Sequence, residues 1–190
     1  GVCGKDDRTA ALQDLLFYAA QGIAMYAHRA RLLGAVDEEV DVFVSEALYQ
    51  TVANVSFDEE RLAAVIRSAA RVRDEARAMY EKAASLSNGG VEPEAPHGPA
   101  DWSPADSLEG LIAQGRTASI ETWAEEHGED AASLRELIAY GLKGTAAYIH
   151  HAHVLGHDDR GIHATVHEAL DLLARPVFPV DELLSWTLRI

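Results

Sequence analysis

The sequence predicts an all-α protein made of two three-helix bundles that arose by internal duplication and are joined by a linker rich in glycine and proline. Apolar residues recur with the 3.6-residue period of amphipathic helices. Two segments match without a gap when they are offset by 122 positions. Cap residues and glycines separate the periodic segments. The predicted units are a first bundle over 1–87, a linker over 88–104 and a second bundle over 105–190.

The repeat extends over several predicted helices. Residues 12–18 align with residues 134–140, and identical residues continue downstream at a rate far above chance for this composition. We interpret this match as a true internal duplication. Identical pairs include Gly22/Gly144, Tyr26/Tyr148, His28/His150, Gly34/Gly156 and Glu46/Glu168.

In the first copy, a helix is predicted over 8–33, and Gly34 ends it as a left-handed cap. A second helix opens with the acidic run 37–39, which suits the positive end of the helix dipole, and ends near Asn54. A third helix opens with a capping box over 56–59 and continues to about 86. The apolar stripe of the first helix is Leu12, Leu15, Leu16, Ala19, Ile23, Ala27 and Ala30.

The second copy repeats the plan with helices over about 131–155, 160–174 and from 179 onward. Short helices are expected at 105–113 and 120–126, and the linker is expected to be exposed. The last helix is much shorter than its counterpart, which would leave apolar surface bare. We therefore expect the natural chain to continue past Ile190 and to begin before Gly1.

Charge and cysteine content exclude several classes of protein. The chain carries 16 basic and 31 acidic residues, a net charge of −15, so nucleic acid and anionic membrane are unsuitable partners. No segment approaches the roughly 20 apolar residues needed to span a bilayer. Cys3 is the single cysteine, which rules out an internal disulfide and favours the cytoplasm.

Cys3 lies in the sequence Gly-Val-Cys-Gly-Lys. Glycines let the backbone turn tightly and point N–H groups at a sulfur, as in many iron–sulfur sites. The alternative is a free thiol with no role. Because an iron–sulfur cluster needs about four ligands, Cys3 could be only one member of a set.

The histidines offer a second candidate metal site. The i, i+4 spacing of His163 and His167 would place both rings on one helical face, as a divalent metal requires. A polar helix face and cations near a helix C-terminus explain the same residues, and we favour that interpretation. The match of His28 with His150 also favours a structural role. The other late histidines are His151, His153 and His157.

Glu46 and Glu168 could ligate a di-iron centre inside a bundle, but the Glu-x-x-His companions of such sites are missing. We favour hydrogen bonding or a solvated face for both. We find no phosphate-binding loop, no Ser/His/Asp motif and no Cys-x-x-Cys. Four tyrosines at matching positions are expected to be core aromatics with a hydrated hydroxyl: Tyr18, Tyr26, Tyr140 and Tyr148.

In combination, several segments resemble the N-terminal helical domain of the hybrid cluster protein family, also called prismane proteins or hydroxylamine reductases. The resemblance covers nearly the whole chain apart from the linker. The segments are Gly1-Val2-Cys3-Gly4-Lys5 and residues 12–16, 54–61, 133–137, 140–148 and 151–156.

The resemblance implies an oxidoreductase whose first domain is two three-helix bundles. It implies that Cys3 is the last of four cysteines holding an iron–sulfur cluster, of the [4Fe-4S] or [2Fe-2S] type, near the N-terminus. It also implies a hybrid iron–sulfur–oxygen cluster in later domains, where hydroxylamine or nitric oxide is reduced, and a redox partner protein. The other cluster ligands would lie outside this sequence, so no residue here is assigned to catalysis and the chain alone should be inactive.

Two alternatives stay open. The first is a non-enzymatic helical scaffold or oligomerisation module that associates with itself through the apolar surface of the second bundle. The second is a metal binder based on histidine. The preferred hypothesis is the helical part of a cytoplasmic hydroxylamine reductase-type iron–sulfur enzyme.

Overall fold

The computed structural model describes residues 4–53, 57–87, 92–176 and 180–190, and these are helical with no strand. The predicted all-α class is thereby confirmed. Within the described ranges, no helix has the length and apolar character to cross a membrane. The elements are α1 (Asp7–Leu32), α2 (Glu38–Val52), α3 (Glu59–Leu86), the 3-10 helix η1 (Gly98–Ala100), α4 (Leu108–Thr117), α5 (Ile120–His127), α6 (Glu129–Val154), α7 (Arg160–Leu173) and α8 (Val180–Arg189).

Helix starts are set by short polar side chains that accept hydrogen bonds from the first free N–H groups. The Asp6 carboxylate caps α1 by accepting from the Thr9 N–H at 2.8 Å. Asp37 caps α2, and Asp159, 122 positions later, caps α7 in the same way. The predicted starts of these helices therefore agree with the structure to within two residues.

The ends of α1 and α6 are built alike. Gly34 and Gly156 both have φ near +80°, the left-handed region that glycine adopts without strain. In each case the next residue donates back to a carbonyl five positions earlier, Ala35 to Ala30 and His157 to Ala152, both at 2.9 Å. This is a Schellman motif. The shared geometry favours the duplication, which stays a prediction.

The start of α3 differs from the predicted capping box. The helix begins at Glu59, and its cap is Asp58, whose carboxylate accepts from the Arg61 N–H at 3.1 Å. The predicted cap residue, Ser56, lies outside the described residues. Assigning the cap to Ser56 was wrong because the aspartate two positions later fills that role.

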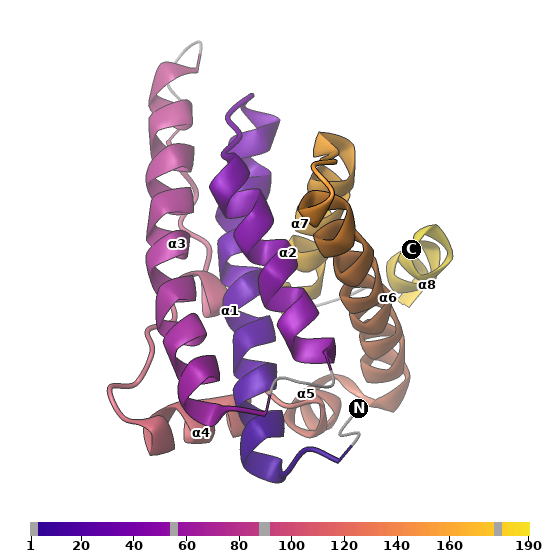
Figure 1. The fold of residues 1–190 in the computed structure, drawn as a ribbon. Coiled ribbons are helices and arrows are strands. Elements are labelled where there is room, and N and C mark those ends of the chain that lie inside the picture. Colours follow the sequence, from indigo (N-terminus) through magenta and orange to yellow (C-terminus); the bar gives the residue numbers. More distant parts are fainter. Residues whose placement is uncertain (1–3, 54–56, 88–91, 177–179) are drawn as a thin grey trace.

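The two predicted copies pack side by side, so that the first helix of each copy contacts the second helix of the other. Figure 1 shows α3, α1 and α7 side by side, with α2 crossing in front of α1 and α6 beyond it. Contacts between the copies join α1 to α7 and α2 to α6. The 122-residue offset relates α1 to α6 and α2 to α7. The contact of α1 with α7 therefore corresponds to the contact of α6 with α2. The packing therefore has an approximate two-fold relation between the copies.

One continuous core runs through both copies. Its fully buried side chains come from α1, α2, α3, α4, α6, α7 and α8. The short helix α4, assigned by sequence to the second unit, packs on α1 and α3 of the first. The division of the chain at residues 104 and 105 is thus not a packing boundary. The largest of these side chains include Leu12, Leu15, Leu16, Ile23, Leu48, Leu62, Ile66, Leu111, Ile112, Ile138, Leu142 and Leu170.

The linker is less exposed than predicted. Pro96, Pro99 and Ala100 are buried, and η1 packs directly on α1. A glycine in α1, Gly22, leaves room for the Pro99 carbonyl to approach the helix backbone. The expectation of an exposed linker over 88–104 was wrong for this part because its apolar residues find a partner on α1; residues 88–91 lie outside the described chain.

The four tyrosines are not equivalent. Tyr26 is 4% exposed and its ring lies 6.4 Å from that of Tyr80 on α3. Its counterpart Tyr148 is 81% exposed, and Tyr140 is 41% exposed. The core role predicted for Tyr140 and Tyr148 was wrong because no described element covers their face of α6 as α3 covers α1.

Candidate functional site

The segment that follows Cys3 is attached firmly to the bundle. Cys3 itself lies outside the described residues. Gly4 has φ +84°, a left-handed conformation. The next side chain, Lys5, is 8% exposed, and its Nζ donates to Gln13 Oε1 at 2.8 Å and to the Thr51 carbonyl at 3.3 Å. The backbone beside Cys3 is therefore tied to α1 and to the last turn of α2.

A pocket of about 460 Å³ adjoins this attachment, and Gln13 and Thr51 line it as well as holding Lys5. Its walls are α1, the connection between α4 and α5, and α6. The volume is within the range of small-molecule sites. This hollow lies between the two predicted copies of the repeat.

Seven charged side chains line the pocket, and Asp7, Arg116 and Glu121 are three of them. Asp14 comes from α1, whereas Arg135, Glu136 and Lys143 come from α6. Arg135 and Lys143 are only 7% and 9% exposed. Arg135 Nη1 lies 3.2 Å from Glu136 Oε1. Among the described contacts, no ion pair within 4.0 Å joins Asp14 to Lys143.

Aromatic faces hold the two buried cations. Lys143 Nζ lies 5.0 Å from the ring centroid of Phe17 and 5.3 Å from that of Tyr140. The Arg135 guanidinium lies 5.1 Å from the Trp123 ring, and its Nε has no hydrogen-bond partner among the described atoms. Cation–π contacts of this kind stabilise a charge without neutralising it.

Burial perturbs the titration of these groups. It raises the pKa of Asp14 to about 6, against the opposing effect of the Lys143 charge. Burial also lowers the pKa of Lys143 and of Arg135, against the opposing effects of the Glu136 and Asp14 carboxylates. Each of the three groups therefore lacks part of the solvation that it would have in water.

This pocket was missed by sequence reasoning, although a signal existed. Positions that carry neutral amides in the first copy carry cations in the second, where a charge on a buried helix face is unusual. The replacements at the 122-residue offset are Gln13/Arg135 and Gln21/Lys143, and the neighbouring pair is Asp14/Glu136.

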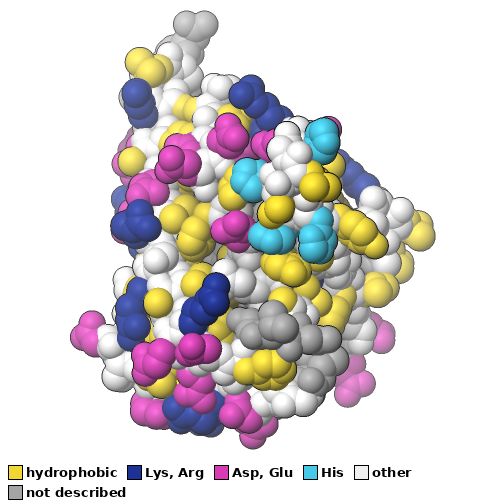
Figure 2. All heavy atoms as spheres, in the orientation of Figure 1, with side chains coloured by type: hydrophobic (Ala, Val, Ile, Leu, Met, Phe, Trp, Pro, Cys, Tyr) yellow, Lys and Arg dark blue, Asp and Glu magenta, His cyan; other side chains and the backbone are white. Residues whose placement is uncertain are grey.

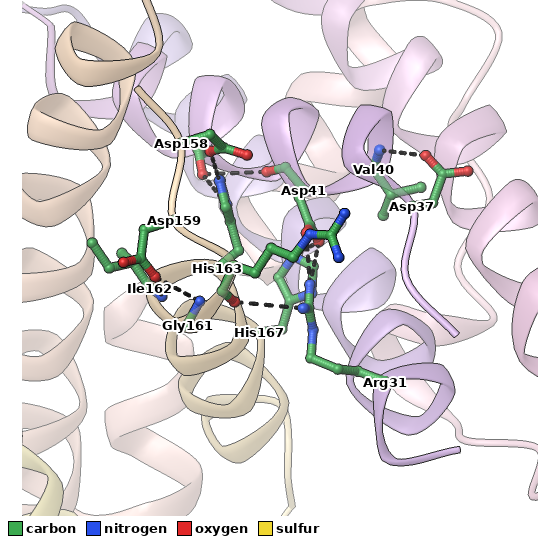
Figure 3. A network of polar contacts seen from close by, with 12 residues as sticks. Arg31, Asp37, Val40, Asp41, Asp158, Asp159, Gly161, Ile162, His163 and His167 are labelled. Atoms are coloured by element: carbon green, nitrogen blue, oxygen red, sulfur yellow. Dashed lines mark hydrogen bonds and ion pairs between the residues drawn. The ribbon is translucent and has the colours of Figure 1, made fainter. Parts of the chain in front are cut away.

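A second polar cluster lies between α2 and α7 (Figure 3). The Ser45 hydroxyl lies 3.3 Å from His163 Nδ1, and His163 Nε2 lies 2.7 Å from Asp158 Oδ1. This order of groups is that of a hydrolase triad. However, Ser45 is 2% exposed, lies 3.2 Å from the Asp41 carbonyl, and adjoins a cavity of only about 10 Å³. No substrate can reach this serine. The cluster therefore has a structural role, in which it connects α2 to α7.

The neighbouring group connects α1, α2 and α7 (Figure 3). Arg31 Nη2 donates to both carboxylate oxygens of Asp41, at 2.7 and 2.6 Å. His167 is fully buried; its Nε2 lies 3.6 Å from Asp41 Oδ1, and neither ring nitrogen has a hydrogen-bond partner. Burial, together with the nearby Arg31 charge, lowers the pKa of His167 to about 3. The imidazole is therefore neutral.

The histidines form no metal centre within the described residues, where no group of three or more potential ligands converges. His163 and His167 share a face of α7, as predicted, but each ring lies in the interhelical contacts above. Other histidines gather on the surface where α6 ends (Figure 2). There His150 stacks on Tyr49 with ring centroids 4.6 Å apart.

The equivalent glutamates do not face each other. A Glu46 oxygen lies 3.9 Å from His150 Nδ1, and a Glu168 oxygen lies 3.2 Å from Arg189 Nη2. Glu168 is in a partly exposed ion pair and Glu46 lies beside a partly exposed imidazole, in keeping with the polar role that we favoured over a di-iron site.

Comparison with known proteins shows the family. The model of the Prismane/CO dehydrogenase family matches residues 1–189. The chain belongs to this family. The resemblance found in the sequence is confirmed.

Relatives of this prismane-family chain are named hydroxylamine reductase. The chain is 45% identical over 189 residues to the protein from Rhodospirillum rubrum, a match that covers 100% of this chain and 34% of the relative. It is 49% identical over 181 residues to the protein from Acidiphilium cryptum, covering 95% of this chain and 32% of the relative. The chain thus spans about a third of the length of the curated relatives it matches.

An iron–sulfur cluster, which the family implies, is only partly accommodated by the donors of this prismane-family chain. The sequence has one cysteine, and the described residues contain no group of three or more ligands. A cluster needs about four. One cysteine does not supply four ligands, so a cluster would need ligands besides those of this chain, and the role of Cys3 stays a prediction.

Proposed function

We propose that this chain is the helical part of an iron–sulfur oxidoreductase that reduces hydroxylamine to ammonia, with nitric oxide as a further substrate. The observation that carries the proposal is the family match over residues 1–189, together with full-length relatives named hydroxylamine reductase. The hybrid cluster where reduction takes place would be bound outside this chain.

Within that enzyme, Cys3 would supply one thiolate to an iron–sulfur cluster of the [4Fe-4S] or [2Fe-2S] type. Such a cluster supplies single electrons when bound. The residues of this chain would position it: the buried Lys5 and its contacts with Gln13 and Thr51 fix the backbone two positions after the thiolate.

Cys3→Ser in the full-length protein tests the proposal. We expect lower iron content, weaker visible absorbance and hydroxylamine reduction at least roughly tenfold slower, because even second-shell changes cost about 10–100-fold at metal sites. Iron analysis, absorbance and steady-state rates are the measurements. Unchanged iron content in Cys3→Ser would rule out this residue as a ligand.

Lys5→Met tests the positioning role separately, with the exposed Lys82→Met as its matched control. Methionine keeps the length of the side chain but leaves the Gln13 and Thr51 oxygens without that donor. We expect Lys5→Met to retain less iron than the parent protein during dialysis against a chelator. Lys82→Met should retain as much iron as the parent. Equal retention by both variants would show that Lys5 does not position the cluster.

Partners are also proposals. An electron-donating protein is expected to reduce the first cluster. Self-association is a second proposal, in keeping with the alternative of a scaffold, and rests on exposed apolar side chains of α6 and α8. These side chains are Leu137, Tyr148, Leu184 and Leu188, exposed by 56%, 81%, 47% and 91%.

Sedimentation of the 190-residue chain tests the proposed self-association. We expect the sedimentation coefficient to rise with concentration in the micromolar range, and Leu188→Glu to suppress that rise because a charge at the contact must be desolvated. A compact monomer at all micromolar concentrations would refute self-association.

We also propose a cytoplasmic location, which the single cysteine favours.

A further inference from the structure

We propose that the pocket between α1, the α4–α5 connection and α6 binds a small zwitterion, such as an ω-amino acid, whose carboxylate faces α6 and whose ammonium group faces Asp14. This inference concerns a site in this chain alone and does not depend on the iron–sulfur function. It rests on the volume of the pocket, the distribution of its charges and the lack of partners for them.

The charges of the pocket are divided between its walls. Asp7 and Asp14, on α1, make that wall negative. The α6 wall carries Arg135, Glu136 and Lys143, an excess of one positive charge, and Arg116 and Glu121 offset each other on the third wall. A ligand that carries both signs complements both walls at once.

Among the described residues, neither Asp14 nor Lys143 has an ion-pair partner within 4.0 Å. The Lys143 ammonium is held by two rings and not by an acceptor. Arg135 is 93% buried in the wall, and its Nε lacks an acceptor. Buried groups of this kind are normally paired.

The pocket is also large enough for such a ligand. Its volume, about 460 Å³, exceeds that of a short amino acid and lies at the low end of small-molecule sites. The faces of Phe17 and Tyr140 provide apolar contact for a methylene chain beside Lys143. Ordered water alone would pair the same groups, and that is the outcome the experiment must separate.

The experiment is a titration of the full-length protein with glycine, β-alanine and 4-aminobutyrate, followed by calorimetry at pH 7.5. Acetate and ethylamine, which carry one charge each, are the matched half-ligands. We expect at least one amino acid to bind about tenfold or more tightly than either half-ligand, because a second charge-assisted hydrogen bond has roughly that effect.

Variants locate the site. Asp14→Asn and Lys143→Met are each expected to weaken binding of the best amino acid about tenfold or more, whereas Lys82→Met, remote on α3, leaves it unchanged. Circular dichroism and thermal melting identify any variant that fails to fold, and Asp14→Asn keeps the shape of the side chain. The proposal is overturned if no amino acid saturates the protein below 100 mM, since only water then fills the pocket. It is also overturned if acetate binds as well as the amino acids, or if folded Asp14→Asn retains full affinity.

Discussion

Gly22→Ala lowers the free energy of unfolding by about 3 kcal/mol or more, although the same substitution at the matching position of the repeat has the opposite sign. A Cβ on Gly22 would overlap the carbonyl oxygen of Pro99. The carbonyl belongs to the backbone and the position of the Cβ is fixed by the helix backbone, so neither can rotate away. Separating η1 from α1 exposes buried Pro99 and Ala100, and overpacking of this kind costs about 1–3 kcal/mol or more.

Gly144→Ala is the matched control. Gly144 also lies inside a long helix, but a Cβ there would meet no atom within 4 Å. Alanine is a better helix former than glycine by about 1 kcal/mol, so this variant should be slightly more stable than the parent. Urea unfolding of the 190-residue chain, followed by circular dichroism, measures both. A change of the same sign and size in the two variants would contradict the contact between η1 and α1.

The buried group formed by Arg31, Asp41 and His167 produces the second large effect, which is a dependence of stability on pH. His167 has a pKa of about 3 in the folded protein and about 6.5 when unfolded. Between these values the unfolded state binds more protons than the folded state, so stability falls as pH falls from 6.5 towards 3. One pKa unit corresponds to about 1.4 kcal/mol, so a pKa lower by about 3.5 in the folded protein contributes a loss of up to roughly 5 kcal/mol over that range.

His167→Leu isolates this contribution, because leucine fills a similar volume and cannot be protonated. Asp14 acts in the other direction: its raised pKa makes it bind more protons when folded, so its contribution to stability increases as pH falls from about 6 to 3.8. The measurement is therefore the difference between the parent and His167→Leu in urea unfolding at several pH values from 7 to 4. We expect that difference to shift in favour of the variant as the solution becomes more acidic. Parallel pH profiles would show that His167 does not titrate on unfolding.

Asp41→Asn examines the same group at neutral pH. It keeps the shape of the side chain but leaves the Arg31 guanidinium, which donates to both carboxylate oxygens, as an uncompensated charge in a largely buried site. Breaking a buried ion pair by removing one partner costs about 3–5 kcal/mol. Glu75→Gln, in the exposed pair with Arg71, is the control and should change stability by less than about 1 kcal/mol. Similar losses in the two variants would contradict the burial of the Asp41 pair.

Much of the helical architecture could be predicted because its causes are local. The apolar stripe of α1 follows from the spacing of Leu12, Leu16 and Ile23, all of which are buried. The caps at Asp37 and Asp159 and the glycine ends at Gly34 and Gly156 need only their neighbours in the chain. Such signals are complete within one helix, so no tertiary information is required to interpret them.

The candidate site could be predicted only in part. Cys3 was recognised from the motif around it, yet the pocket with Asp14, Arg135 and Lys143 was not expected. Its residues belong to α1 and α6, two helices that are distant in sequence and face the same pocket because α7 packs on α1 and α6 packs on α2. The exposed linker was predicted from glycine and proline content, and composition does not show that Pro99 finds a partner on α1.

Identical residues at matching positions show where sequence stops being sufficient. The sequence alone determined that Gly22 and Gly144, or Tyr26 and Tyr148, occupy equivalent places on two similar helices. Only the tertiary structure decided that Gly22 touches Pro99 while Gly144 touches nothing, and that Tyr26 is buried while Tyr148 is 81% exposed. The physical reason is that helix formation depends on hydrogen bonds and side chains a few positions apart, whereas burial and charge compensation depend on which other element covers each face.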